Sequence, residues 1–232
     1  MNDALAAPVV ECRGLEKVFS NTTTPVAVLR GVDLRVESGD MMAVVGVSGV
    51  GKTTLLYVMG LLERPSAGEL LFDGAPVFGQ MSDAELSAFR NRKIGFVFQF
   101  HHLIQEFTVL ENVMMPCVIA GMSERAGRDA ALAALAQLGI DHRADHKPGE
   151  VSGGEQQRAA VARALVMRPR LVLADEPTGN LDERTAAVMH DEFVRLNTEL
   201  GITFVVVTHN EELARRMTSV VRLHDGKAEH LK

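Results

Sequence analysis

The sequence has no tryptophan, one tyrosine and two cysteines in 232 residues. Cys12 and Cys117 lie far apart and neither has a second cysteine nearby, which argues against a disulfide framework. No stretch reaches the roughly 18 consecutive apolar residues that span a bilayer. The first residues also lack the basic start of a secretory signal. We therefore expect a cytoplasmic protein that meets a membrane only through partners.

An excess of basic residues is also missing. The chain has 24 Lys and Arg against 30 Asp and Glu, a formal net charge of -6. Nucleic-acid binders usually carry the opposite balance, so we expect no nucleic-acid partner. Hydrophobic residues make up 47% and charged residues 23%, which is typical of a globular domain. The length fits a single domain, at most two lobes that share a core.

Short apolar runs alternate with helical stretches along most of the chain. Runs that are apolar on both faces predict central strands of a parallel sheet at residues 41–45, 94–98, 171–174 and 204–207. Helical spacing predicts helices at 52–59, 124–138, 154–167 and 182–200. Earlier runs at 9–18 and 26–36 predict a small antiparallel sheet. Each central run ends in polar or glycine-rich residues, where α/β sheets place their ligands.

The first of these ends matches the phosphate-loop pattern G-x-x-x-x-G-K-[ST] between an expected strand and an expected helix. The loop comprises Gly46, Val47, Ser48, Gly49, Val50, Gly51, Lys52 and Thr53, and Thr54 follows in the helix. Its glycines let backbone N–H groups surround phosphate oxygens. Lys52 is placed to reach the β- and γ-phosphates, and the Thr53 hydroxyl to bind Mg²⁺.

Three other segments supply groups that suit phosphate chemistry. Asp175 and Glu176 end an apolar run, where one carboxylate can hold Mg²⁺ and the other can polarise water. Ser-Gly-Gly at 152–154 begins a helix and offers a second anion site. Gln99 and His209 each follow a strand, and their value lies in belonging to this ordered set.

The order of phosphate loop, glutamine, Ser-Gly-Gly, Asp-Glu and histidine resembles the nucleotide-binding domain of ABC transporters along nearly the whole chain. This resemblance implies an α/β P-loop NTPase of the ABC type, with a mostly parallel central sheet, a small antiparallel β subdomain and an inserted helical subdomain. It implies a single ATPase domain, residues 1–232. The RecA-like core with the β subdomain takes 1–98 and 155–232, and the helical subdomain about 99–154.

The same resemblance implies ATP hydrolysis with Mg²⁺, by a homodimer whose active sites are shared between two chains. Glu176 and His209 are then the catalytic pair, and Thr53, Gln99 and Asp175 the metal ligands. Further nucleotide contacts are implied for Phe19, which would stack on adenine, and for Ser152, Gly153, Gly154, Glu155, Gln156 and Asp182. Val50 and Val151 depart from the usual small polar residue and leucine. Since Val50 contributes its backbone N–H, neither change affects the expectation of ATP binding.

Within the superfamily, residues 98–104, 107–113, 141–144 and 173–182 resemble the ATPases of lipoprotein-releasing systems. That resemblance implies a peripheral subunit on the cytoplasmic face of the bacterial inner membrane. It would bind two transmembrane permease subunits of the LolC and LolE kind through about Phe100 to Pro116, and drive lipoproteins toward the outer membrane.

Three alternatives remain open from the sequence. One is the ATPase of a related exporter or mechanotransmission complex, of the macrolide-export or cell-division type. Another is a soluble ABC ATPase that acts on nucleic acid, although only 53 positions (152 − 99) separate Gln99 from Ser152, which leaves no room for a long coiled-coil arm. The third is a nucleotide-binding module without turnover, against which Glu176 and His209 argue.

Overall fold

The computed structural model describes residues 7–20 and 24–232, so the first six residues, on which the expectation about a leader partly rested, lie outside it. The chain forms two compact units. The first comprises Met1–Leu86 and Thr203–Lys232, and the second comprises Ser87–Ile202. Within the described ranges, no helix is both long and apolar enough to cross a membrane.

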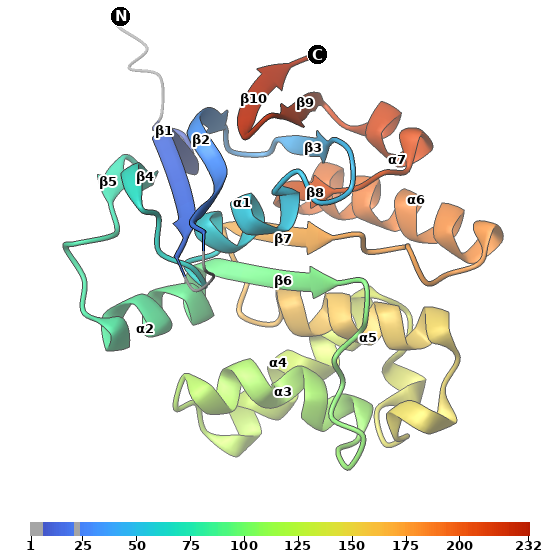
Figure 1. Ribbon diagram of the computed structural model, residues 1–232. Coiled ribbons are helices and arrows are strands. Elements are labelled where there is room, and N and C mark those ends of the chain that lie inside the picture. Colours follow the sequence, from blue (N-terminus) through green and yellow to red (C-terminus); the bar gives the residue numbers. More distant parts are fainter. Residues whose placement is uncertain (1–6, 21–23) are drawn as a thin grey trace, which may run out of the picture. The chain divides into compact units, whose positions relative to one another are not determined.

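An antiparallel sheet forms one part of the first unit (Figure 1). Its strand order is β2 (Val26–Val36), β1 (Val10–Phe19), β4 (Ala67–Phe72) and β5 (Ala75–Pro76). In β2, Val32, Leu34 and Val36 are buried, whereas Asp33 and Arg35 between them are exposed. This period of two buries one face of the sheet. The antiparallel pair expected from the sequence is confirmed.

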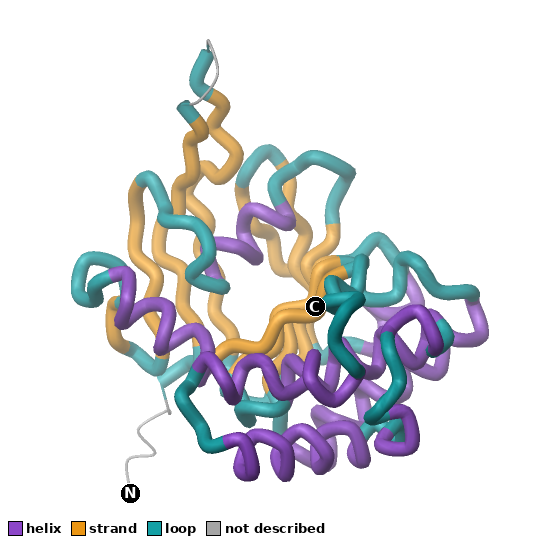
Figure 2. Tube along the Cα trace, turned by 90° about the horizontal axis from the view of Figure 1, so that it is seen from below, coloured by secondary structure: helices purple, strands orange, loops and turns teal. Residues whose placement is uncertain are grey.

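The other strands of the first unit surround β3 (Met41–Val45), which runs parallel to both β8 (Thr203–Val207) and β9 (Ser219–His224). β10 (Lys227–His230) pairs with β9 in the antiparallel sense. Every residue of β8 is buried, as a central strand requires. α1 (Lys52–Met59) follows β3 and packs against β1, β2 and β8, purple among the orange strands of Figure 2. α7 (Glu211–Arg216) follows β8.

In the second unit, β6 (Ile94–Phe98) runs parallel to β7 (Leu171–Asp175). α3 (Val109–Ile119), α4 (Glu124–Gln137) and α5 (Gly153–Leu165) pack on one another, and α5 also packs on β6. Gly95 lets α5 approach closely, because a Cβ there would lie 2.4 Å from the Ala164 carbonyl oxygen. α6 (Glu183–Leu200) follows β7. α2 (Asp83–Lys93) contains the boundary between the units.

The expected strands and helices are all present, with ends that shift by at most two residues. The helix expected at 154–167 begins one residue earlier and ends at Leu165, before Arg168 takes a left-handed φ of 51°. Other elements had no expected counterpart: the helices α2, α3 and α7 and the strands β4, β5, β9 and β10. Of these, α3 begins with a capping box between Thr108 and Glu111 and contains Pro116. The proposed subdomain boundaries at 98/99 and 154/155 stay a prediction.

Candidate nucleotide-binding site

The phosphate loop leaves β3 in a conformation that only glycine adopts comfortably. Gly46, Gly49 and Gly51 have φ values of 153°, 77° and 108°. A Cβ on Gly46 would lie 2.5 Å from the Leu223 carbonyl oxygen, and one on Gly51 would lie 2.6 Å from Val28 Cγ1. The glycines thus permit the turns of the loop and its close packing against Leu223 and Val28.

Lys52 is held directly over this loop. Its Nζ donates to the carbonyl oxygens of Gly46 at 2.8 Å and Val47 at 3.0 Å. Gly51 is the N-cap of α1 and has no side chain, so the cap supplies no acceptor to the first turn of that helix. An ammonium group and the N–H groups of a helix start therefore meet at one loop, which is the donor set that triphosphate oxygens require.

His209 belongs to the same unit and faces the same region as the start of the loop. β8 pairs with β3 in register, with Val207 opposite Val44. The segments that follow the two strands therefore leave the sheet at the same edge. A cavity of about 560 Å³ there is lined by Gly46, Val47 and His209. Four charged residues also line this cavity, three of them cationic: Arg215, Arg222, Lys232 and Glu211. The expected histidine thus shares a cavity with the phosphate loop.

Phe19 ends β1 and is half-buried. The Lys17 ammonium lies 4.9 Å from the centre of its ring, a cation–π contact. Lys17 also donates to Glu63 and to the Arg64 carbonyl oxygen, so this side chain is fixed. The ring is therefore supported on one side, and its role in stacking on adenine stays a prediction.

In the second unit, the ends of two parallel strands bring the carboxylates and the glutamine together. Phe98 at the end of β6 pairs in register with Asp175 at the end of β7, so Gln99 and Glu176 follow at adjacent strand ends. Glu176 has a φ of 46°, unusual for a residue with a side chain. Such a conformation costs about 1–3 kcal/mol and persists where the surroundings hold it. The proposed base therefore occupies a strained turn.

Gln99 is joined to Asn180 by a reciprocal pair of hydrogen bonds. Gln99 Nε2 donates to Asn180 Oδ1, and Asn180 Nδ2 donates to the Gln99 carbonyl oxygen, both at 3.0 Å. Gly179 permits this contact, since a Cβ there would lie 2.9 Å from Gln99 Nε2. The Gln99 side-chain oxygen takes no part in this pair of bonds, and its role as a metal ligand stays a prediction.

The Ser-Gly-Gly segment forms the amino-terminal end of α5, as expected. Ser152 is the N-cap, and its Oγ accepts from the backbone N–H of Glu155 at 3.3 Å. The Glu155 carboxylate accepts in return from the Ser152 N–H and hydroxyl, and also from Arg143. These bonds, those from Ser152 first, lower the pKa of Glu155 to about 2. The carboxylate is therefore ionised at neutral pH.

The start of α6 lies against this helix end. A Cβ on Gly154 would approach Thr185 Cγ2 to 2.8 Å, so the glycine allows close packing there. Asp182 caps α6 by accepting from the Thr185 N–H at 3.0 Å and its hydroxyl at 2.7 Å. The second unit thus gathers two motifs that the sequence keeps far apart, the signature at 152–156 and the turn at 179–182.

The residues expected to bind Mg²⁺ are all oxygen donors, as that cation prefers. They are Thr53 in the first unit and Gln99 and Asp175 in the second. Among the described residues, no group of three or more His, Cys, Asp or Glu could hold a metal ion. A hydroxyl, a carboxylate and an amide oxygen are ligands that suit Mg²⁺ bound together with substrate phosphates and water.

Two residues of this region were missed as site candidates. Asn180 lies within the resemblance at 173–182, but its pairing with Gln99 joins residues 81 positions apart, which no spacing rule predicts. Arg143 contacts Glu155 from 12 positions away. Opposite charges at that separation carry no signal without knowledge of the intervening fold.

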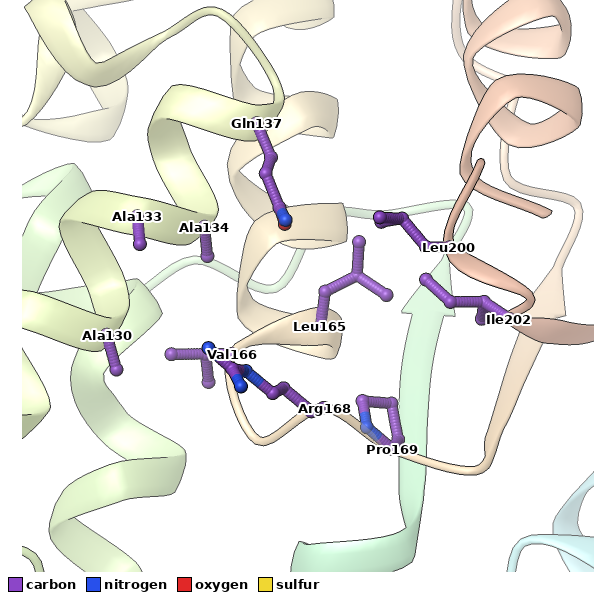
Figure 3. Close-up of a pocket in the computed structure, with 10 residues that line it drawn as sticks. All are labelled: Ala130, Ala133, Ala134, Gln137, Leu165, Val166, Arg168, Pro169, Leu200 and Ile202. Atoms are coloured by element: carbon purple, nitrogen blue, oxygen red, sulfur yellow. The ribbon is translucent and has the colours of Figure 1, made fainter. Parts of the chain in front are cut away.

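A separate cavity of about 400 Å³ lies in the second unit (Figure 3). Ala130, Ala134 and Gln137 of α4 line one side, and Leu165 and Leu200 lie opposite. Among the described residues that line this cavity, none is expected at the nucleotide site and only Arg168 is charged. Most of the side chains that line the cavity are apolar, and none belongs to the expected phosphate-binding motifs.

Comparisons with known proteins agree with this geometry. The model of the ABC transporter family matches residues 29–179. The "Lipoprotein-releasing system ATP-binding protein LolD" of Geobacter metallireducens is 52% identical over 219 residues, covering 94% of this chain and 97% of that protein. LolD of Pseudoalteromonas translucida is 48% identical over 98% of this chain and 96% of its own.

Among solved structures, the dimeric structure of MJ0796, described as a bacterial ABC transporter cassette, has a TM-score of 0.85 and 37% identity. The likeness covers 96% of this chain and 99% of that one. A second structure of MJ0796 is described as a post-hydrolysis dimer bound to ADP and Pi. These likenesses confirm the expected α/β P-loop fold of ABC type. Because the family model covers more than half of the chain and the relatives align along almost all of it, the chain belongs to the ABC transporter family.

Proposed function

We propose that this chain is the ATP-hydrolysing subunit of an ABC transporter that releases lipoproteins from the inner membrane toward the outer membrane. The observation that carries the proposal is the near full-length likeness to LolD proteins, 52% identity over 94% of the chain. The name of those relatives, as parts of lipoprotein-releasing systems, supports the cargo. The phosphate loop and the carboxylates support the chemistry.

The phosphate groups of ATP are the ligands of the first unit. Lys52 exchanges its contacts with the Gly46 and Val47 carbonyl oxygens for phosphate oxygens, and the first turn of α1 supplies N–H donors. His209, which shares a cavity with the loop, steadies the γ-phosphate and the attacking water. Phe19 supports the adenine ring. These groups position charge; they do not break the bond themselves.

Hydrolysis needs a base, and Glu176 is the carboxylate in that role. It accepts a proton from water as the water attacks the γ-phosphorus, and the bond to the β–γ bridging oxygen breaks to give ADP and phosphate. Thr53, Asp175 and the Gln99 side-chain oxygen would hold Mg²⁺, which supplies charge neutralisation on the phosphates when bound. Asn180 fixes the Gln99 amide by accepting from its nitrogen, which leaves the oxygen out of that bond.

Two copies of the chain are needed for each active site in this proposal. One copy offers the phosphate loop, and the other offers Ser152 with the N–H groups of Gly153 and Gly154 at the start of α5. The solved dimers of MJ0796 support this arrangement, since the likeness covers 96% of this chain. ATP then joins the copies, and hydrolysis releases them.

The coupling to membrane subunits is assigned to Phe100–Pro116. Phe100 and Ile104 are 65% and 39% exposed, while Leu103 and Leu110 are buried within the unit. The apolar anchors available to a partner are therefore Phe100 and Ile104, with half-buried Phe107 beside them. An exposed apolar pair on an ordered segment suits a short helix from a partner. The segment follows Gln99 directly, so it can respond to the bound nucleotide.

The test uses Glu176→Gln in a complex of this chain with its two membrane subunits in proteoliposomes. Removing the base should lower the ATPase rate by about 10²–10⁴-fold and abolish lipoprotein release, while ATP binding and assembly survive. Glu229→Gln on exposed β10 is the matched control and should change neither activity. Near-normal hydrolysis in Glu176→Gln would disprove the base assignment. Hydrolysis without lipoprotein release in the unaltered complex would disprove the cargo and favour a related exporter.

A further inference from the structure

The amino-terminal end of α5 carries a fixed negative charge. The proposed function requires this same helix end to bind a phosphate. Glu155 lies in the first turn of α5, three residues after the N-cap Ser152. Its Oε2 accepts from the Ser152 N–H at 2.8 Å and from the Ser152 hydroxyl at 2.7 Å. An ionised carboxylate beside Ser152 would repel the γ-phosphate of a second copy's ATP.

Arg143 lies on the opposite side of this carboxylate. Its Nε donates to Glu155 Oε1 at 2.7 Å, so the two carboxylate oxygens have separate partners. The pair is partly sheltered, with side-chain exposures of 36% for Arg143 and 23% for Glu155. At 2.7 Å the contact is a charge-assisted hydrogen bond, and it offsets the charge locally. The Glu155 carboxylate is thereby held back onto its own helix cap.

The segment that carries Arg143 is itself anchored. Arg143 ends a 3₁₀ turn, Asp141–Arg143, and its Nη1 lies 3.5 Å from His146 Nε2. The carbonyl oxygens of Ala144 and His146 accept from the backbone N–H groups of Leu110 and Val109, at 2.9 and 2.8 Å. The segment that follows Arg143 is thus anchored to the first turn of α3. The resemblance at 141–144 had no assigned role, and these contacts supply one.

We propose that Arg143 is a positioning residue for the shared ATP site. It neutralises Glu155 and keeps that carboxylate turned onto Ser152, so that the start of α5 can accept the γ-phosphate of ATP held by a second copy. This inference rests on the proposed function, in which two copies share each ATP. Arg143 acts through Glu155 and does not touch the nucleotide itself.

The test measures ATP-dependent dimerisation by light scattering across ATP concentrations, with every chain also carrying Glu176→Gln to prevent turnover. Arg143→Gln should raise the ATP concentration for half-maximal dimerisation roughly tenfold, because the Glu155 charge is then uncompensated. Adding Glu155→Gln to that variant should recover most of the loss, since a glutamine also completes the capping box without charge. Arg125→Gln is the matched arginine control, because the Arg125 side chain on α4 is 94% exposed, and it should behave like the parent.

A second measurement separates positioning from folding. ATP binding by the monomer depends on the phosphate loop of the first unit, so Arg143→Gln should leave it unchanged, along with the thermal unfolding midpoint to within a few degrees. Parent-like dimerisation of Arg143→Gln would overturn the inference. So would a double variant as weak as Arg143→Gln alone, which would mean that the arginine acts sterically. If the Glu176→Gln parent itself does not dimerise with ATP, the proposed shared site is wrong, and the inference about Arg143 is then wrong as well.

Discussion

Gly46 illustrates how one residue sets the local chemistry. Its φ of 153° is one that L side chains rarely adopt, and a Cβ would meet the Leu223 carbonyl oxygen at 2.5 Å. That oxygen belongs to the backbone of β9 and has little room to yield. Any side chain at this position must therefore displace the phosphate loop from β9, which moves the carbonyl oxygen that Lys52 bonds.

Gly46→Ala should accordingly lose ATP binding and lower the free energy of unfolding by about 2–3 kcal/mol. Gly39→Ala is the matched control, since Gly39 has a φ of 84° and a Cβ added there would meet no other atom within 4 Å. It should cost only about 1 kcal/mol and leave ATP binding unchanged. Chemical denaturation and titration with a fluorescent ATP analogue measure the two effects. Equal behaviour of the two variants would contradict the backbone clash.

Glu155 predicts a pH dependence with a definite sign. Its pKa falls from 4.5 to about 2 in the folded chain, because of its bonds with Ser152 and Arg143. A lowered folded pKa means that the unfolded chain takes up the proton first as pH falls. The contribution of Glu155 to stability is therefore complete above its ordinary pKa and is lost as pH falls toward about 2.

The wild-type chain should thus lose more stability than Glu155→Gln when the pH is lowered through this window. Urea midpoints of both chains, measured from neutral pH down to about 3, give the comparison. A constant difference between the two chains at every pH would show that the Glu155 carboxylate titrates normally.

At the scale of elements, the segment before α3 is organised by one buried side chain. Asn112 is 1% exposed, and its Oδ1 accepts from the Ile104 N–H at 2.7 Å. Its Nδ2 donates to the carbonyl oxygens of Ile104, Phe107 and Thr108, at 3.0, 3.3 and 2.9 Å. The exposed Ile104 therefore projects from a loop whose backbone is tied to the helix that follows.

Asn112→Ala should remove all four bonds and lower the free energy of unfolding by roughly 2–4 kcal/mol. It should also increase hydrogen exchange at residues 104–108, because their backbone groups lose their partners. Asn91→Ala is the control, as the Asn91 side chain donates to the Pro116 carbonyl oxygen at 3.0 Å, and its loss should cost about 1 kcal/mol. Unchanged exchange in the 104–108 segment of Asn112→Ala would contradict this role.

At the scale of the whole molecule, the chain carries two separate helix starts for which we propose phosphate binding, at α1 and at α5. The proposed function assigns them to different copies in each active site. Lys52→Ala damages the first and Ser152→Arg the second, since it places a bulky cation at the end of α5. Each variant alone should have no ATPase activity, because every shared site contains one defect.

A mixture of the two variants should recover activity. Each heterodimer contains one site with both residues intact and one site with both defects. Phosphate release from the mixture, compared with each variant alone at equal total concentration, measures the recovery. Two separate preparations of Lys52→Ala, mixed in the same way, are the control for handling. No recovery, with heterodimers present by mass spectrometry, would mean that the site is not shared in this way.

The sequence by itself determined the phosphate loop, the strands that lead to the functional residues, and the family. These features are local. A loop of fixed spacing between a strand and a helix specifies its own geometry. An apolar run such as 204–207 indicates a strand that is buried on both faces. α3 was not among the predicted helices, because it contains Pro116 and proline is unfavourable inside a helix. The capping box at its start favours the helix nevertheless. The sequence offered no means of weighing those opposing signals.

Only the tertiary structure decided which distant groups meet. Gln99 and Asn180 pair across 81 positions because β6 and β7 are neighbours that end in register. Arg143 reaches Glu155 because a 3₁₀ turn anchored to α3 brings it beside the start of α5. The packing also buried Leu103 and Leu110 and left Phe100 and Ile104 exposed. Spacing along the chain specifies contacts within one loop or helix, whereas contacts between segments depend on how strands pair and helices pack.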